Sequence, residues 1–157
     1  MSKSSKDCTE QSSDKHLIRF FFEDLEEKPI LFATLENGLI ACSRKEALPI
    51  KSINVIFCSD RYLSGLNVKY LNHEDLTDVI TFPLASNPIE GEIYISWERV
   101  IENAFHYSDN NLTKELNRVV LHGFLHLCGY SDKSEPDKTR MRNKEDQYLN
   151  EFPRIHF

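Results

Sequence analysis

The sequence predicts a single α+β domain in which a small mixed sheet of four strands is packed with about five helices. Strand-like and helical patterns follow one another in the order strand, helix, strand, helix, two strands and three helices. The chain of 157 residues is long enough to bury one substantial core, and no internal repeat or low-complexity linker divides it. We expect a mobile polar tail over residues 1–15, followed by one domain over residues 16–157.

The first half of the chain is expected to hold two strands and two helices. The aromatic run Ile18–Phe22 predicts the first strand, and a helix follows from Ile30, with Asn37-Gly38 expected to interrupt or soften it. Ile53–Cys58 has the continuous apolar character of a buried strand. Ser59 or Asp60 can cap the next helix, and its inner face is expected to hold Tyr62, Leu63, Leu66 and Tyr70.

The second half adds two strands and three helices. We expect a third strand over Val79–Phe82 that is closed by Pro83, a turn at residues 86–88, and a fourth strand over Glu92–Ile95. Ser96 can cap a helix whose inner face holds Val100, Ile101, Ala104 and Phe105. The last helix is expected to begin at the capping box Ser134–Asp137 and to end near Asn150.

The helix between these elements carries the strongest functional pattern. His122 and His126 are four residues apart, so they lie one turn from each other beside an apolar stripe. Gly129 can end the helix in a left-handed turn, after which Asp132 can return to face both rings. Two neutral imidazoles and one carboxylate form the ligand set of an open, catalytic zinc site. The pattern predicts one Zn²⁺ per chain, held by His122 and His126 on this central helix and by Asp132 after the turn.

Other interpretations of the same residues remain open. A histidine pair at this spacing is often only the polar flank of a helix, and two histidines with one carboxylate also suit iron or nickel. The layout matches the zinc helix and turn of metzincin proteases, but those enzymes carry a glutamate base directly after the first histidine. Gly123 occupies that position here, which argues against a protease.

Three segments resemble the YbeY family of bacterial metal-dependent endoribonucleases. They are His122–Asp132, Thr77–Pro83 and Gly91-Glu92-Ile93, within a similarity that extends from about Ile53 to Leu149. The resemblance implies an α+β fold and a zinc-dependent, single-strand-specific endoribonuclease. It also implies action in ribosomal RNA processing, at the 3′ end of 16S RNA, and in ribosome quality control. Ribosomal RNA and ribosome or small-subunit proteins would then be the partners.

The chain departs from the pattern of that family at two positions. Asp132 stands where the family usually has a third histidine, and Leu71 follows Tyr70 where the family usually has arginine. A site that cleaves RNA needs a cation to receive charge on the phosphate. Lys69, Arg61 and Arg118 are the candidates. Arg118 lies one turn before His122, but the alternative is a surface ion pair with Glu115 on the same helix.

Composition sets limits on these hypotheses. The net charge of −6 counts against strong non-specific binding of nucleic acid, although a local basic groove is compatible with it. No apolar run is long enough for a bilayer span or a signal peptide, and four scattered cysteines suggest reduced thiols, so we expect a cytoplasmic location. Two alternatives to the endoribonuclease are a ribosome-assembly factor with a structural metal and a metal-dependent hydrolase of another substrate.

Overall fold

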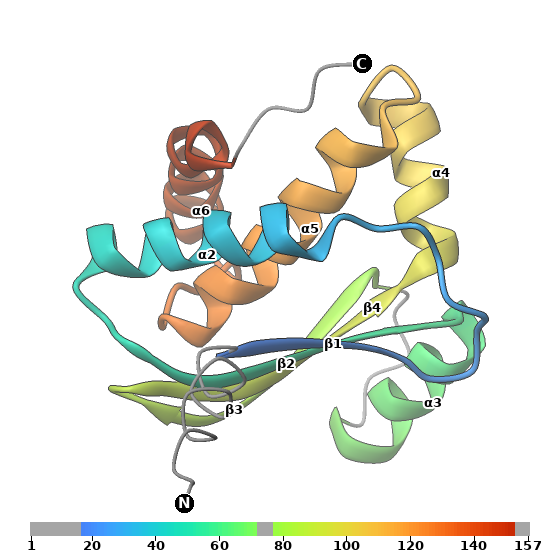
Figure 1. The fold of residues 1–157 in the computed structure, drawn as a ribbon, viewed down its shortest axis with the longest axis horizontal. Coiled ribbons are helices and arrows are strands. Elements are labelled where there is room, and N and C mark those ends of the chain that lie inside the picture. Colours follow the sequence, from blue (N-terminus) through green and yellow to red (C-terminus); the bar gives the residue numbers. More distant parts are fainter. Residues whose placement is uncertain (1–16, 72–76, 153–157) are drawn as a thin grey trace, which may run out of the picture.

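A mixed sheet of four strands forms the base of the structure (Figure 1). The structure is a computed structural model and describes residues 17–71 and 77–152, so the predicted tail over residues 1–15 lies outside the described residues. The sheet order is β1-β2-β4-β3. Strands β1 (Ile18–Phe22), β2 (Ile50–Cys58) and β4 (Ile89–Ser96) are parallel, and β3 (Val79–Ser86) runs antiparallel along the edge beside β4. The predicted mixed sheet is confirmed.

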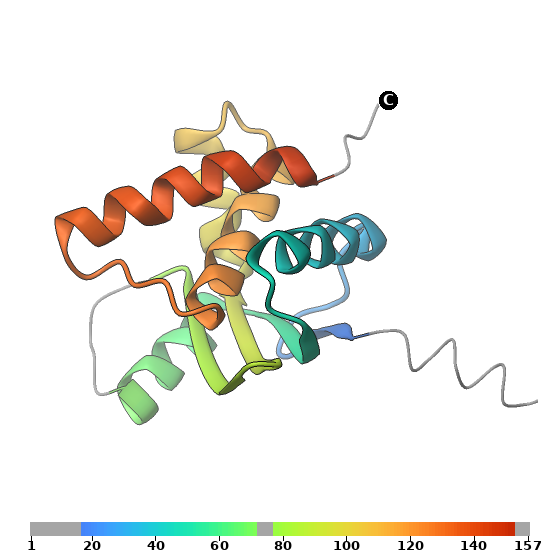
Figure 2. The same ribbon diagram turned by 90° about the vertical axis from the view of Figure 1, so that its left-hand side faces the viewer.

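The described residues form five helices around this sheet, as the sequence predicts. They are α2 (Phe32–Glu46), α3 (Asp60–Leu71), α4 (Trp97–Tyr107), α5 (Leu112–Leu127) and α6 (Glu135–Tyr148), and a 3₁₀ turn over Leu149–Glu151 follows α6. Helices α2, α5 and α6 lie over one face of the sheet, whereas α3 lies on the opposite side (Figures 1 and 2). The side chains of Ser59, Ser96 and Ser134 cap α3, α4 and α6, which confirms three predicted helix starts.

Helix α5 is the centre of the main core. It contacts β3, β4, α2, α4 and α6. Its buried residues, which include Val120, Leu121 and Phe124, meet the inward-facing strand residues Val55 and Ile93. A smaller cluster around Cys58, Leu63 and Ile80 lies on the other face of the sheet under α3. Because packing holds α5 on several sides, the histidines near its end are carried by one of the most constrained elements of the fold.

The predicted interruption of α2 at Asn37-Gly38 is wrong. The helix is continuous through both residues. A Cβ atom on Gly38 would overlap the ring of Phe152, so the glycine permits close packing of Phe152 against α2 rather than a break. One glycine inside a helix costs only about 1 kcal/mol, which tertiary packing readily offsets.

The strand limits also differ from the prediction. Strand β3 continues through Pro83 to Ser86 because it is an edge strand with an irregularity between Pro83 and Ala85, where a missing N–H is tolerated. Strands β2 and β4 each begin three residues earlier than predicted, since pairing with each other extends them. The predicted turn at residues 86–88 connects β3 to β4.

The predicted inner faces of two helices are partly wrong. In α3, Leu63 is buried, but Tyr70 is 57% exposed and touches only the edge of the sheet through the ring of Phe82. In α4, Val100 and Ala104 are buried, whereas Ile101 and Phe105 are exposed because the contact stripe of this helix is narrow. Among the described residues, no helix has the length and apolar character needed to cross a membrane.

Candidate metal centre

The turn after α5 brings the three predicted ligands together. The helix ends at Leu127, and Gly129 has φ +106°, a left-handed conformation that favours glycine. The chain then reverses, with the Tyr130 N–H donating to the Leu125 carbonyl at 3.0 Å. The Oδ2 atom of Asp132 thereby lies 3.3 Å from His122 Nε2 and 3.4 Å from His126 Nε2. The two Nε2 atoms are 3.1 Å apart.

This triangle of donor atoms fits a small divalent cation. Zinc bonds nitrogen and oxygen at about 2.0–2.2 Å, so neighbouring donors around a tetrahedral ion are separated by about 3.3 Å. The observed separations of 3.1, 3.3 and 3.4 Å are close to that spacing. Three ligands from the protein would leave a fourth position open, which is the arrangement of catalytic rather than structural zinc. The donor set therefore fits the predicted metal.

Each histidine is oriented by a hydrogen bond at its other ring nitrogen. His126 Nδ1 is 3.0 Å from the Tyr130 carbonyl oxygen, which accepts only, so Nδ1 carries the proton and Nε2 keeps its lone pair. His122 Nδ1 is 2.5 Å from Oε2 of Glu145, a buried carboxylate on α6. Such partners fix the tautomer and the ring angle of metal-binding histidines. Both rings therefore present Nε2 toward Asp132.

The electrostatic environment differs between the two rings. Burial alone would lower the pKa of His122, but the hydrogen bond and charge of Glu145 outweigh it and raise the pKa above its usual value. Burial and the neighbouring His122 lower the pKa of His126. Glu145 therefore gives the imidazole of His122 more basic character, which strengthens it as a ligand.

Arg118 lies beside the centre but is held by two carboxylates. Its Nη1 donates to Glu145 Oε1 at 2.9 Å, and its Nε is 3.6 Å from Glu115 Oε1. Glu115 also accepts a hydrogen bond from Ser108 at 2.9 Å. The alternative pairing with Glu115 is thus present, together with a shorter contact to Glu145. Glu145 was not singled out in the sequence because it is one of many charged residues in α6.

The other two candidate cations lie on α3. Lys69 Nζ is 5.1 Å from the ring centroid of Tyr70, and Arg61 is exposed at the start of the helix. Neither is among the described residues that line the two clefts beside the centre. The structure therefore brings Arg118 close to the ligand triangle, but neither Lys69 nor Arg61.

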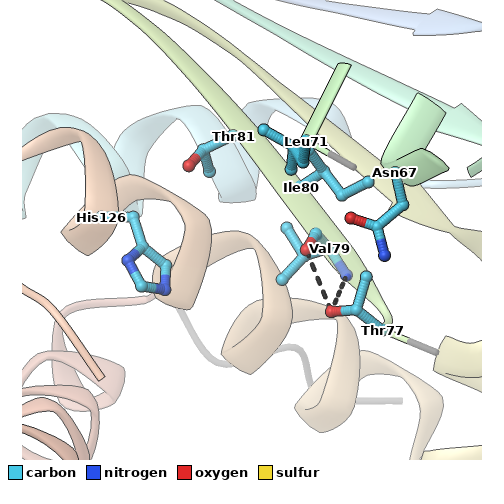
Figure 3. A pocket seen from close by; sticks show the side chains of 7 residues that line it. All are labelled: Asn67, Leu71, Thr77, Val79, Ile80, Thr81 and His126. Atoms are coloured by element: carbon cyan, nitrogen blue, oxygen red, sulfur yellow. Dashed lines mark hydrogen bonds between the residues drawn. The ribbon is translucent and has the colours of Figure 1, made fainter. Parts of the chain in front are cut away.

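Two clefts border the centre, one lined by His126 and the other by His122 and Asp132. The first, which we call the α3 cleft, has a volume of about 240 Å³ (Figure 3). It is lined by His126 and by residues of α3 and β3, namely Asn67, Leu71, Thr77, Val79, Ile80 and Thr81. The second, the α6 cleft, has a volume of about 440 Å³ and is lined by Arg118, His122, Asp132, Lys138, Met141, Arg142, Glu145 and Asp146. Among the described residues, the lining of the α3 cleft has no charged side chain apart from His126, whereas that of the α6 cleft has six.

Glu46 supports the turn that carries the ligands. At the end of α2, its carboxylate accepts hydrogen bonds from the Tyr130 hydroxyl at 2.9 and 3.1 Å and from the Tyr148 hydroxyl, and it pairs with Lys144 at 3.3 Å. Tyr130 is the residue whose carbonyl orients His126. Burial alone would raise the pKa of Glu46, but these hydrogen bonds hold it below the usual value.

Substitution Glu46→Gln is expected to lower the free energy of unfolding at pH 7 by about 1–3 kcal/mol, because charged hydrogen bonds are lost. A carboxyl whose folded pKa is lowered stabilises the fold above its unfolded pKa, near 4.5, and loses that contribution as pH falls through the folded value. The difference in free energy of unfolding between wild type and Glu46→Gln should therefore shrink below about pH 4.5.

Urea denaturation of metal-free protein at several pH values measures this difference. Glu27→Gln, at an exposed loop position, is the control. An equal difference in free energy of unfolding at every pH would contradict the stabilising role of the ionised Glu46 carboxylate.

Comparisons with known proteins agree with this geometry. The family model described as Endoribonuclease YbeY matches residues 24–153. The Endoribonuclease YbeY of Amoebophilus asiaticus is 42% identical over 84% of this chain and 90% of its own length. That of Flavobacterium psychrophilum is 52% identical over 64% of this chain and 71% of its own length.

A solved structure extends the similarity to three dimensions. The solution structure of a protein from Thermotoga maritima has a TM-score of 0.61 and 34% identity, over 85% of this chain and 87% of that one. The region matched by the family model begins just after β1 and contains strands β2, β3 and β4, the helix of the two histidines and Asp132. On these grounds the chain belongs to the Endoribonuclease YbeY family.

Proposed function

We propose that this protein is a zinc-dependent endoribonuclease that cleaves single-stranded RNA at the centre formed by His122, His126 and Asp132. The observation that carries the proposal is that three donor atoms converge at a spacing that suits one metal ion. In a chain of this family, such a site can serve the hydrolysis of RNA. Zinc bound there would supply Lewis acidity toward a phosphoryl oxygen and an acidified water.

The protein's own residues hold this site in shape. Glu145 and the Tyr130 carbonyl orient the imidazoles, and Glu46 anchors Tyr130. Asp132 is the most exposed of the three ligands, with 41% of its side chain accessible, so substrate approaches from its side. The two flanking clefts suit a strand that passes the centre, and unpaired RNA can offer its bases and backbone separately to such clefts.

The proposed biological role follows from the family. The cleavage would serve ribosomal RNA processing, at the 3′ end of 16S RNA, and ribosome quality control. The partners would be ribosomal RNA and small-subunit or ribosome-associated proteins, in the cytoplasm.

Metal removal is the direct test of the proposed activity. Purified protein should cleave a single-stranded RNA and leave the matched duplex intact, and dialysis against a chelator should abolish cleavage. Adding back Zn²⁺, Fe²⁺ or Ni²⁺ separately should restore it best with zinc. Cleavage that persists in metal-free protein would overturn the metal assignment. One metal per chain without cleavage of any RNA would favour the assembly factor or a different substrate.

A further inference from the structure

The α6 cleft contains cations that the metal centre does not use. Lys138 and Arg142 are four residues apart on α6, so they lie one turn from each other on the same face. Both line the cleft together with His122 and Asp132. A group bound to these two side chains would therefore sit beside the metal ligands.

The ion pairs of the cleft distinguish its three cations. Arg118 is held by Glu145 and Glu115. Lys138 is 3.5 Å from Glu135, whose side chain is 88% exposed, and a surface pair of this kind contributes little. Arg142 makes no ion pair or hydrogen bond with any residue that the structure describes. Its guanidinium is thus available for an external anion.

The α3 cleft offers an RNA phosphate no basic side chain among the described residues, which makes Arg142 of the α6 cleft more important. The described residues that line the α3 cleft include no lysine or arginine, so the basic side chains of the two clefts all belong to the α6 cleft, and Arg118 among them is held by carboxylates. Of the acidic residues in the α6 cleft, Asp132 faces the proposed metal and Glu145 is paired, which leaves Asp146. The described lining of the α6 cleft thus balances three basic side chains against three acidic ones, and Arg142 is the basic one among them that no described carboxylate pairs with.

We propose that Arg142, assisted by Lys138, binds the backbone phosphate of a nucleotide that neighbours the cleaved one. The RNA strand then passes from the α3 cleft across the metal centre into the α6 cleft. A guanidinium suits this task because it binds phosphate through two parallel hydrogen bonds. Arg142 is a positioning residue that holds the strand, not a group that contacts the reacting phosphate. This inference rests on the proposed endoribonuclease function.

The test compares Arg142→Gln with Arg140→Gln, which removes the same charge from the same helix. Arg140 is exposed and lies two positions before Arg142, hence on the opposite side of α6, outside the cleft lining. Binding of a fluorescent single-stranded 2′-O-methyl RNA to the zinc-loaded proteins is measured between 50 and 200 mM KCl, a range in which backbone contacts are salt-sensitive. This probe lacks the free ribose hydroxyls, and gel electrophoresis after each titration checks that it is intact, so that its dissociation constant reports on binding alone.

Arg142→Gln should raise the dissociation constant about three- to tenfold and reduce the salt slope of log K by about 0.7, as expected for one lost phosphate contact. KM for cleavable RNA should rise with little change in kcat, and Arg142→Lys should recover part of the affinity. Arg140→Gln should match the wild type, and both variants should keep full zinc content. Equal affinities for Arg142→Gln and Arg140→Gln would overturn the inference while leaving the function intact. A wild-type protein that neither binds nor cleaves single-stranded RNA would overturn both.

Discussion

Replacing Asp132 with alanine is expected to remove the metal from the protein and to reduce RNA cleavage by about 10³-fold or more. The carboxylate lies within 3.4 Å of both Nε2 atoms and supplies the only negative charge among the three proposed ligands. His126→Ala should have the same effect, because it leaves one histidine and one carboxylate. Metal content by elemental analysis and cleavage of single-stranded RNA should fall together in both variants.

The fold should survive these substitutions, so that the losses report on the centre itself. Among the described residues, the ion-pair partners of Asp132 are the two histidines, and its side chain is 41% exposed. Circular dichroism should therefore be unchanged. Glu102→Ala, which removes a carboxylate that is 57% exposed on α4, is the matched control. If Asp132→Ala keeps its metal, Asp132 is not a ligand and the third donor must be sought elsewhere.

The meeting of these three candidate ligands was predictable because they are close in sequence. His122 and His126 are separated by one helical turn, and Asp132 follows within one glycine turn, so spacing alone places all three on one side of α5. The groups that orient the triangle were not predictable in this way. Glu145 and Glu46 come from α6 and α2, and only the packing of these helices against α5 shows what their carboxylates contact.

The same distinction between local and tertiary effects explains which predicted helix and strand limits were wrong. Helix starts at Ser59, Ser96 and Ser134 were predictable because a capping bond joins residues three apart. The continuity of α2 through Gly38 depends on Phe152, which is distant in sequence. The course of β3 beyond Pro83 depends on its place at the edge of the sheet, which topology alone decides.

Gly123→Ala is expected to destabilise the protein by about 1–3 kcal/mol, although alanine is the better helix former by about 1 kcal/mol. An added Cβ would lie 2.6 Å from Cγ2 of Ile93 in β4 and 3.4 Å from Cγ2 of Val79 in β3. The methyl group of Ile93 is fixed close to the backbone, so either the strand or α5 must move. Urea denaturation of metal-free protein measures the difference. Gly65→Ala is the control, because a Cβ on that exposed helical glycine meets nothing within 4 Å and should stabilise α3.

The position of Gly123 also explains the absence of a protease-like glutamate between the two histidines. This residue faces the sheet and not the metal ligands, so a side chain here would enter the core. Gly91 of β4 makes a second close approach, since its added Cβ would lie 2.9 Å from Leu127. Two glycines thus let α5 lie directly on β4, and this contact fixes how far the helix that carries both imidazoles stands from the sheet. Gly123→Ala should consequently weaken metal binding as well as stability. A variant of wild-type stability and wild-type metal affinity would show that the helix can retreat from the sheet without disturbing the centre.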